Sequence, residues 1–335
     1  DDSEGLAGGV VVGGRERLAG SGDHGGTLVG RRIGGRGPVS GHDARMGTGA
    51  FRLTDDQAAA FVRDGFVVLD GLVDPALFGP LRRCFDRLFR GEFETGVEPD
   101  EVNWLEGEGD STLTRQICNG WRADRLVAAT VLRADLGEAI ARLAGWPGAR
   151  IIQDNLLWKP PGARSLGFHR DNAYLPWYRP QEMATCWMAL DDTSAAGGTV
   201  EFARGSHRWP DQGDSEAEFH APQDHRTVVA EAAARHGADL DIVPVEVDAG
   251  GGSFHHGWTW HGSGANDTGT DRRALVMHCA NSGARFHRPG FGEGNGPIYS
   301  RYAQPDDDAM DEAHFPILWR EDGYRTPGLT DPGSR

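Results

Sequence analysis

The chain has 335 residues, of which 34 are basic and 50 are acidic, so its formal net charge at pH 7 is −16. A chain of this length can bury a hydrophobic core, and its strong negative charge argues against nucleic acids and anionic membranes as partners. No stretch approaches the roughly 18 apolar residues of a membrane-spanning helix. The four cysteines form no CxxC pair, which is typical of reduced thiols in a cytoplasmic protein.

Residues 1–45 differ from the rest of the chain. They contain 14 glycines and no sustained apolar periodicity, so they cannot bury enough surface to offset the entropy lost on ordering. We expect a disordered, glycine-rich N-terminal extension, with a regulatory tail as the alternative. Patterned sequence begins directly after Met46. This indicates that the native protein starts there and that residues 46–335 form a single domain.

The first patterned segments are predicted to be mainly helical. Thr54-Asp55-Asp56-Gln57 is a capping box that opens a helix to about residue 63, and the apolar run 66–69 predicts a short buried strand. Asp74-Pro75 supplies an N-cap and a first-turn proline for a helix to about residue 90. A further helical stretch is expected over 123–144, ending at Gly145.

After residue 150 the pattern changes to short strands separated by Gly, Pro and Asp. The predicted strands are 150–158, 166–171, 184–190, 198–203, 243–247, 252–256 and 272–280. Helices followed by many short strands predict a mainly β fold with flanking helices, a jelly roll. The polar segment 207–240 interrupts the strands, with a helix expected over 227–236. It is the candidate lid over a substrate.

Two short motifs and one arginine carry the most specific chemical signal. The sequence His-Arg-Asp at 169–171 places an imidazole and a carboxylate two residues apart, and on a strand both point to the same face. His-Gly-Ser at 261–263 adds a second imidazole, and Arg272 follows eleven residues after that histidine. Two histidines and one carboxylate can hold one face of a metal ion, as in the facial triad of non-haem Fe(II) oxygenases. The arginine suits the carboxylate of a 2-oxoglutarate co-substrate.

Further motifs follow one another in a specific order between residues 150 and 280. They are Lys159-Pro160-Pro161, Phe168-His169-Arg170-Asp171, Trp187-Met188-Ala189-Leu190-Asp191-Asp192, Gly197-Gly198-Thr199-Val200, Gly205-Ser206-His207, His256, His261-Gly262-Ser263, Asn266 and Arg272-Arg273-Ala274-Leu275. With the opening strand at 66–72, this series resembles the phytanoyl-CoA dioxygenase (PhyH-like) family of Fe(II)/2-oxoglutarate-dependent oxygenases. The resemblance covers nearly everything after residue 46. It implies a double-stranded β-helix, a cupin-like jelly roll, and the use of Fe(II), 2-oxoglutarate and O2.

The resemblance assigns the catalytic iron centre to His169, Asp171 and His261. Four other histidines compete for the distal position, namely His255, His256, His278 and His287. His261 is favoured because both the His-Gly-Ser motif and the later arginine are tied to it. The family often has Gln at the middle position of the first motif, where this chain has Arg170. On a strand this side chain points away from the metal.

The resemblance also assigns the co-substrate site. Arg272 would pair with the distal carboxylate of 2-oxoglutarate, and Ser263 would hydrogen-bond the same end. Trp187 and Asn155 would line the pocket around it. Because neighbours on a strand diverge, we expect Arg273 to face solvent or a carboxylate partner instead.

The predicted enzyme releases succinate and CO2 while it hydroxylates or oxidatively cyclises an unactivated C–H bond. A CoA thioester would call for a basic patch, of which this acidic chain gives little sign. Tyr174, Trp177, Trp258 and Trp260 are expected to form aromatic walls of an open cleft. We therefore expect a small polar substrate that contains a sugar or an aminocyclitol, as in antibiotic biosynthesis. The alternatives are an acyl-CoA or amino-acid-derived substrate, or a jelly-roll protein that binds metal without being an oxygenase.

Overall fold

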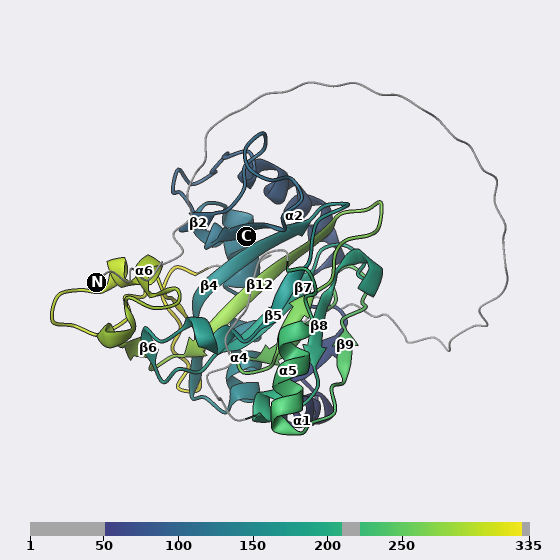
Figure 1. The fold of residues 1–335 in the computed structure, drawn as a ribbon. Helices are drawn as coiled ribbons and strands as arrows, with labels where there is room; N and C mark the ends of the chain where they lie inside the picture. The colour runs from purple at the N-terminus through teal and green to yellow at the C-terminus, as the bar shows by residue number, and fades with distance from the viewer. Residues whose placement is uncertain (1–50, 210–221, 330–335) are drawn as a thin grey trace, which may run out of the picture. The chain divides into compact units, whose positions relative to one another are not determined.

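The computed structural model describes residues 51–209 and 222–329, drawn as the coloured ribbon in Figure 1. The expected extension 1–45 and the part of the expected lid at 210–221 lie outside these described residues. Among the helices that are described, none combines the length and the apolar character that a membrane crossing requires.

The N-terminal elements follow the local sequence signals closely. Helix α1 (Asp55–Asp64) begins at Thr54, and both hydrogen bonds of the expected capping box are present. Strand β1 (Phe66–Leu69) has the predicted bounds. Helix α2 (Pro75–Leu88) begins after Asp74, whose side chain accepts a hydrogen bond from a first-turn backbone N–H group. These starts were predictable because capping is decided by residues within one turn.

The helical stretch expected over 123–144 is two helices, α3 (Arg125–Val131) and α4 (Ala134–Ala144). The break comes at Arg133, whose backbone is extended with φ −66° and ψ 135°. Its guanidinium donates to the carboxylate of Asp135 at 2.6 Å and to the carbonyl of Leu72 at 2.5 Å. These two contacts anchor the start of α4, so tertiary bonding overrides a continuous helical pattern.

Most strands belong to two antiparallel sheets. The large sheet has the order β1-β10-β7-β12-β4-β3-β2, with β14 also paired to β4, and the small sheet has the order β5-β11-β8-β9. Their bounds are β2 Glu101–Val102, β3 Arg115–Cys118, β4 Gly148–Lys159, β5 Leu166–His169, β7 Ala184–Ala189, β8 Val200–Ala203, β9 Ile242–Pro244, β10 Gly252–His256, β11 His261–Ser263, β12 Arg272–Asn281 and β14 Ile317–Arg320. This is the jelly-roll arrangement that the sequence predicted.

Shorter elements fill the connections. A two-stranded ribbon pairs β6 (Tyr178–Arg179) with β13 (Arg285–Phe286), and α6 covers Gly296–Tyr299. The 3-10 turns are η1 Gly120–Arg122, η2 Asp171–Tyr174, η3 Ala195–Gly197, η4 Ser206–Arg208, η5 Arg288–Gly290 and η6 Ser300–Tyr302.

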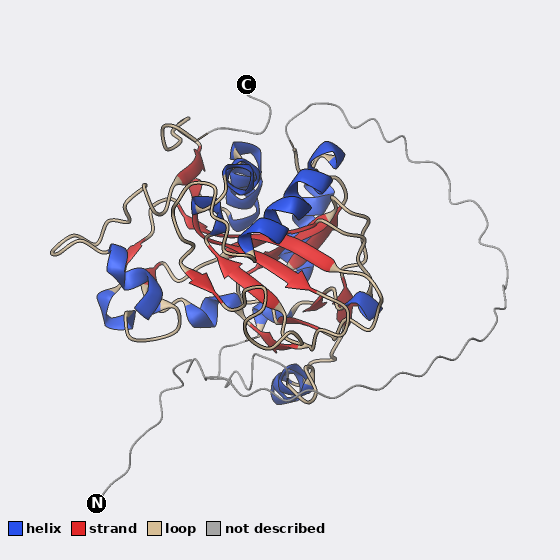
Figure 2. Ribbon diagram, turned by 90° about the horizontal axis from the view of Figure 1, so that it is seen from above, coloured by secondary structure: helices blue, strands red, loops and turns tan. Residues whose placement is uncertain are grey.

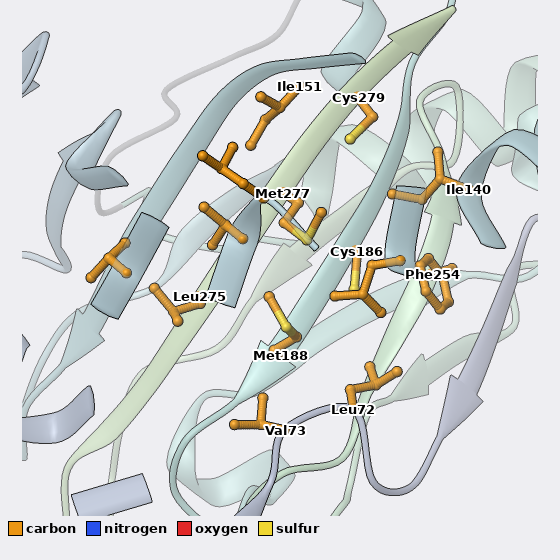
Figure 3. Close-up of a cluster of buried hydrophobic side chains, with 14 of the residues drawn as sticks. Leu72, Val73, Ile140, Ile151, Cys186, Met188, Phe254, Leu275, Met277 and Cys279 are labelled. Atoms are coloured by element: carbon orange, nitrogen blue, oxygen red, sulfur yellow. The ribbon is translucent and has the colours of Figure 1, made fainter. Parts of the chain in front are cut away.

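The two faces of the large sheet bury different sets of side chains. Along β7, Cys186 and Met188 pack with the helical layer, and Figure 3 shows them beside Leu275 and Met277 of β12. The alternate residue Trp187 packs instead with residues of the small sheet. This period of two is the pleat of a strand with both faces buried. Figure 2 shows helices gathered along one face of the sheet, opposite the interior where the two sheets meet.

Several predicted strand limits change in the structure. The strand expected over 166–171 ends at His169, the one expected from 198 begins at Val200, and the one expected to reach 247 ends at Pro244. The three-residue strand β11 was not predicted, because so short a strand depends on its partners and not on its own propensity. Helix α5 (Thr227–His236) has the expected bounds and packs against the small sheet through Val229 and Ala232.

Candidate active site

Strands β5 and β11 bring the two motif histidines together. They are antiparallel neighbours, and His261 lies directly opposite His169 in their register. Arg170 keeps an extended backbone, with φ −125° and ψ 125°. Asp171 therefore returns to the side of His169, although it begins the turn η2 and does not lie on the strand. Asp171 thus lies on the same side as His169, as expected, but it is in a turn and not in the predicted strand.

The potential ligand atoms of His169, Asp171 and His261 all lie within 4.8 Å of one another. Oδ1 of Asp171 is 3.7 Å from Nε2 of His169 and 3.4 Å from Nε2 of His261. For metal–ligand bonds of about 2.1 Å, two ligand atoms at right angles lie roughly 3 Å apart. The three atoms thus surround a space that suits a metal ion held on one face.

Each histidine ring is oriented by its second nitrogen. Nδ1 of His169 donates to the carbonyl of Gly167 at 3.0 Å, and Nδ1 of His261 donates to the carbonyl of Thr259 at 3.0 Å. With the proton on Nδ1, the lone pair of Nε2 faces the ligand space. Burial, followed by the neighbouring His261, lowers the pKa of His169 to about 3. The ring is therefore neutral near pH 7, as a metal ligand must be.

The second oxygen of Asp171 is held by the large sheet. Oδ2 accepts a hydrogen bond from the hydroxyl of Thr185 at 2.8 Å and one from Nε2 of His255 at 3.0 Å. Thr185 pairs with His255 on one side and with His278 on the other in the sheet register. Burial opposes ionisation of Asp171, but His261, His278 and the bond from His255 outweigh it and hold the pKa of Asp171 well below its usual range. Oδ1 is left to face the ligand space.

Two buried basic side chains, Arg272 and Lys159, lie at the other end of the site. Arg272 donates through Nε and Nη2 to the carbonyl of Gly198 at 3.1 and 2.7 Å, while its buried Nη1 has no hydrogen-bond partner among the described residues. Lys159 lies opposite Arg272 in the register of β4 and β12, and its Nζ donates to Oγ of Ser263 at 2.7 Å. Burial and the charge of Arg272 hold the pKa of Lys159 well below its usual range. A buried arginine donor without a partner among the described residues, beside the amine of Lys159, suits a carboxylate.

The structure brings the remaining expected residues to the same cavity. Trp187 lies under the guanidinium of Arg272, with 5.9 Å from the ring centroid to Cζ. Asn155 lies 3.2 Å from Nε2 of His278 through its Nδ2 atom. Arg273 faces the other side of β12, as expected, where it pairs with Asp271 at 2.6 Å and with Asp191 at 3.2 Å.

Sequence reasoning missed Thr185 and Lys159 as members of the site. It considered His255 and His278 only as rival ligands, whereas both lie behind Asp171. The available signal was a polar residue at an alternating position of an otherwise apolar strand, as at Thr185 within Ala-Thr-Cys-Trp-Met-Ala. Which strand each polar residue would face depends on register, which that signal does not contain.

The ligand space opens into a cavity of about 310 Å³. Its lining includes every expected site residue, and beyond them Tyr174, Leu166, Met183, Glu101, Gln116, Gln153 and Asn295. The expected aromatic walls are correct for Tyr174 and wrong for Trp177 and Trp260, which are fully buried in separate hydrophobic clusters. Trp258 does not line the cavity either and packs against Arg170. These rings serve packing because the space between the elements needs their volume.

Comparison with known proteins gives a consistent result. Residues 61–274 match the model of the phytanoyl-CoA dioxygenase (PhyH) family. The multifunctional dioxygenase prhA of Penicillium brasilianum is 25% identical over 233 residues, which cover 66% of this chain and 70% of that protein. The peroxisomal phytanoyl-CoA dioxygenase of Homo sapiens is 23% identical over 253 residues, or 70% of each chain.

Solved structures share the fold. The non-haem alpha-ketoglutarate-dependent carbocyclase SnoK from nogalamycin biosynthesis superposes with a TM-score of 0.62 at 23% identity, over 80% of this chain and 97% of that one. The epimerase SnoN, in complex with Fe3+, alpha-ketoglutarate and nogalamycin RO, gives 0.59 at 23% identity, over 79% and 98%. The chain therefore belongs to the phytanoyl-CoA dioxygenase family and is a 2-oxoglutarate-dependent non-haem iron dioxygenase.

Proposed function

We propose that this dioxygenase hydroxylates or oxidatively cyclises an unactivated C–H bond of a small polar molecule that contains a sugar or an aminocyclitol, with release of succinate and CO2. The observation that carries the proposal is the chemistry of the cavity beyond the ligand space. There Gln116, Gln153 and Asn295 offer neutral hydrogen-bonding groups beside the carboxylate of Glu101. Such a lining suits hydroxyl and amino groups better than a hydrocarbon chain.

In this proposal His169 and His261 bind Fe(II) through Nε2, and Asp171 binds it through Oδ1. Fe(II) with 2-oxoglutarate and O2 supplies the oxidising power that removes a hydrogen atom from the substrate. The hydrogen bonds at the Nδ1 atoms of the two histidines keep both rings aimed at the metal. Thr185 and His255 keep Oδ1 of the carboxylate turned the same way.

Arg272 and Ser263 bind the distal carboxylate of 2-oxoglutarate in this proposal. The buried Nη1 of Arg272, which has no other partner among the described residues, donates to it. Trp187 and Asn155 form the walls beside the co-substrate and exclude water from it. The co-substrate would supply the oxidising chemistry, and these residues would orient it.

A CoA thioester fits the cavity less well. Its phosphates need several cations, but Arg272 is the single arginine or lysine among the described residues that line the cavity. That arginine is committed to the co-substrate. SnoK and SnoN come from nogalamycin biosynthesis, which supports a role for this chain in antibiotic biosynthesis.

The test is a screen of glycosides, aminocyclitols and acyl-CoA thioesters for substrate-dependent succinate release with Fe(II), followed by product mass. One added oxygen indicates hydroxylation, and a loss of two hydrogens indicates cyclisation or desaturation. His261→Ala should abolish turnover and weaken metal binding, whereas His287→Ala, a histidine outside the cavity lining, should leave both unchanged. Turnover of a fatty acyl-CoA together with none of any glycoside would overturn the proposed substrate class. Full activity of His261→Ala would overturn the ligand assignment.

A further inference from the structure

Glu101 is a carboxylate at the cavity that the reaction itself does not use. It lies on β2, the outermost strand of the large sheet, and its side chain lines the cavity. Among the described residues its side chain contacts the thiol of Cys118, which donates to it with Sγ 3.5 Å from Oε2. The preceding residue, Asp100, is in contrast neutralised by Arg122 at 2.9 Å and by Arg301 at 2.5 Å. Of these two adjacent carboxylates, Asp100 is thus paired with arginines, whereas Glu101 lines the cavity.

The charges of the cavity leave one place for a cation. Among the described lining residues, the acidic and basic side chains other than histidine are Asp171, Arg272 and Glu101. The first belongs to the proposed metal site and the second to the proposed co-substrate site. No arginine or lysine of the described chain forms an ion pair with Glu101 of the kind that Asp100 makes. A carboxylate at a ligand cavity without an internal cation is suited to a cation of the ligand.

The sheet register gives the number of strands between Glu101 and the residues behind Asp171. Glu101 lies opposite Cys118, and Cys118 lies opposite Asn155. Asn155 in turn contacts His278 on β12, which lies behind Asp171. From β2 to β12 there are three strand spacings, about 14 Å in all at roughly 4.8 Å each, less the reach of the side chains. Glu101 and His278 therefore lie on strands about 14 Å apart, so a group bound by Glu101 is remote from the proposed metal site.

We propose that Glu101 binds a positively charged amino group of the prime substrate, remote from the oxidised carbon, and so selects an amine-bearing molecule over its neutral counterpart. This inference rests on the proposed function, whose substrate class it narrows from molecules that contain a sugar or an aminocyclitol to those that carry a free amino group. Glu101 is exposed, so it stands at the cavity mouth and the bound ammonium group remains partly hydrated. The preference should accordingly be moderate, about ten-fold in affinity.

The test compares paromamine, an aminocyclitol pseudodisaccharide, with its fully N-acetylated form. Binding is measured by calorimetry without O2 on the enzyme loaded with metal and 2-oxoglutarate. The wild type should bind the amine about ten-fold more tightly than the acetylated form. Glu101→Gln should remove this difference. Glu98→Gln makes the same change of charge at an exposed residue outside the cavity lining, and it should keep the difference.

The outcomes separate this inference from the proposed function. Equal affinities in the wild type, binding of neither probe, or a preference that persists in Glu101→Gln would overturn the role of Glu101. Succinate release stimulated by neutral glycosides, in any of these cases, would leave the proposed function standing. Stimulation by acyl-CoA thioesters alone would overturn the proposed function itself.

Discussion

Replacing Arg272 with alanine should weaken the binding of 2-oxoglutarate far more than the binding of the prime substrate. Arg272 is 3% exposed and lines the cavity, and its Nη1 has no hydrogen-bond partner among the described residues. Its pKa is lowered to about 10 by burial, so it remains charged at neutral pH. A charge-assisted hydrogen bond contributes about 1.5–3 kcal/mol, and removing one partner leaves the other charge buried and unpaired. We therefore expect a loss of about 3 kcal/mol, or roughly 100-fold in the dissociation constant of 2-oxoglutarate.

The neighbouring arginine provides the matched control. Arg273 lies on the opposite side of β12, where it pairs with Asp271 and Asp191 and stacks on Trp158 with Cζ 4.8 Å from the ring centroid. Arg273→Ala removes the same charge but touches no cavity atom, so the dissociation constant should change by less than about three-fold. The measurements are calorimetric titration of 2-oxoglutarate without O2 and the apparent KM values of both substrates. Equal effects of the two variants, or a larger effect of Arg273→Ala, would refute this reading of the strand.

Two further substitutions test the hydrogen bond that Thr185 makes to Asp171 and the buried carboxyl group of Asp154. Thr185→Val removes the hydroxyl that holds Oδ2 of Asp171 and should weaken Fe(II) binding about 10- to 100-fold in a metal titration. Thr130→Val, at another buried hydroxyl that bonds within helix α3, should not, and equal affinities of the two variants would contradict the support role. Burial raises the pKa of Asp154 from 3.8 to about 8, so its stabilising contribution is full below about pH 4 and is lost as the pH rises to 8. Asp154→Asn stays neutral, and its gain in Tm over the wild type should grow between pH 5 and pH 8. A gain that is independent of pH would contradict this.

The elements that the sequence predicted well are those whose signals are local. The capping box at Thr54 and the proline at the start of α2 act within one turn, and the apolar run of β1 is bounded by Gly65 and Asp70. The break at Arg133 could not be predicted in the same way. It depends on a bond to the carbonyl of Leu72, which lies 61 residues earlier in the chain. Such a partner is known only once the sheet and the helices are assembled.

The candidate site likewise combines residues that local signals predicted with residues that only the assembled fold brings together. His169 and Asp171 share a side because two residues of extended chain bring them there, and this spacing is visible in the sequence. Thr185, His255 and His278 meet Asp171 only because β10, β7 and β12 pair in one register. Their strands lie far apart in the sequence, so no short motif contains all three. Lys159 was named within a motif, but its role at the site was not predicted for the same reason, since its partner Ser263 lies 104 residues later.

Because the proposed metal centre lies between the two sheets, its geometry depends on how the side chains of the core pack. The two histidines come from the small sheet, whereas the groups that hold Oδ2 of Asp171 come from the large sheet. Phe202 of β8 lies opposite His261 in the small sheet, and its ring centroid is 4.9 Å from that of His255 in the large sheet. It also stacks on Phe66 at 4.7 Å between centroids. One buried ring thus contacts both a proposed ligand and the group that orients another. Because interiors are close-packed, a change of volume at Phe202 must displace one of them.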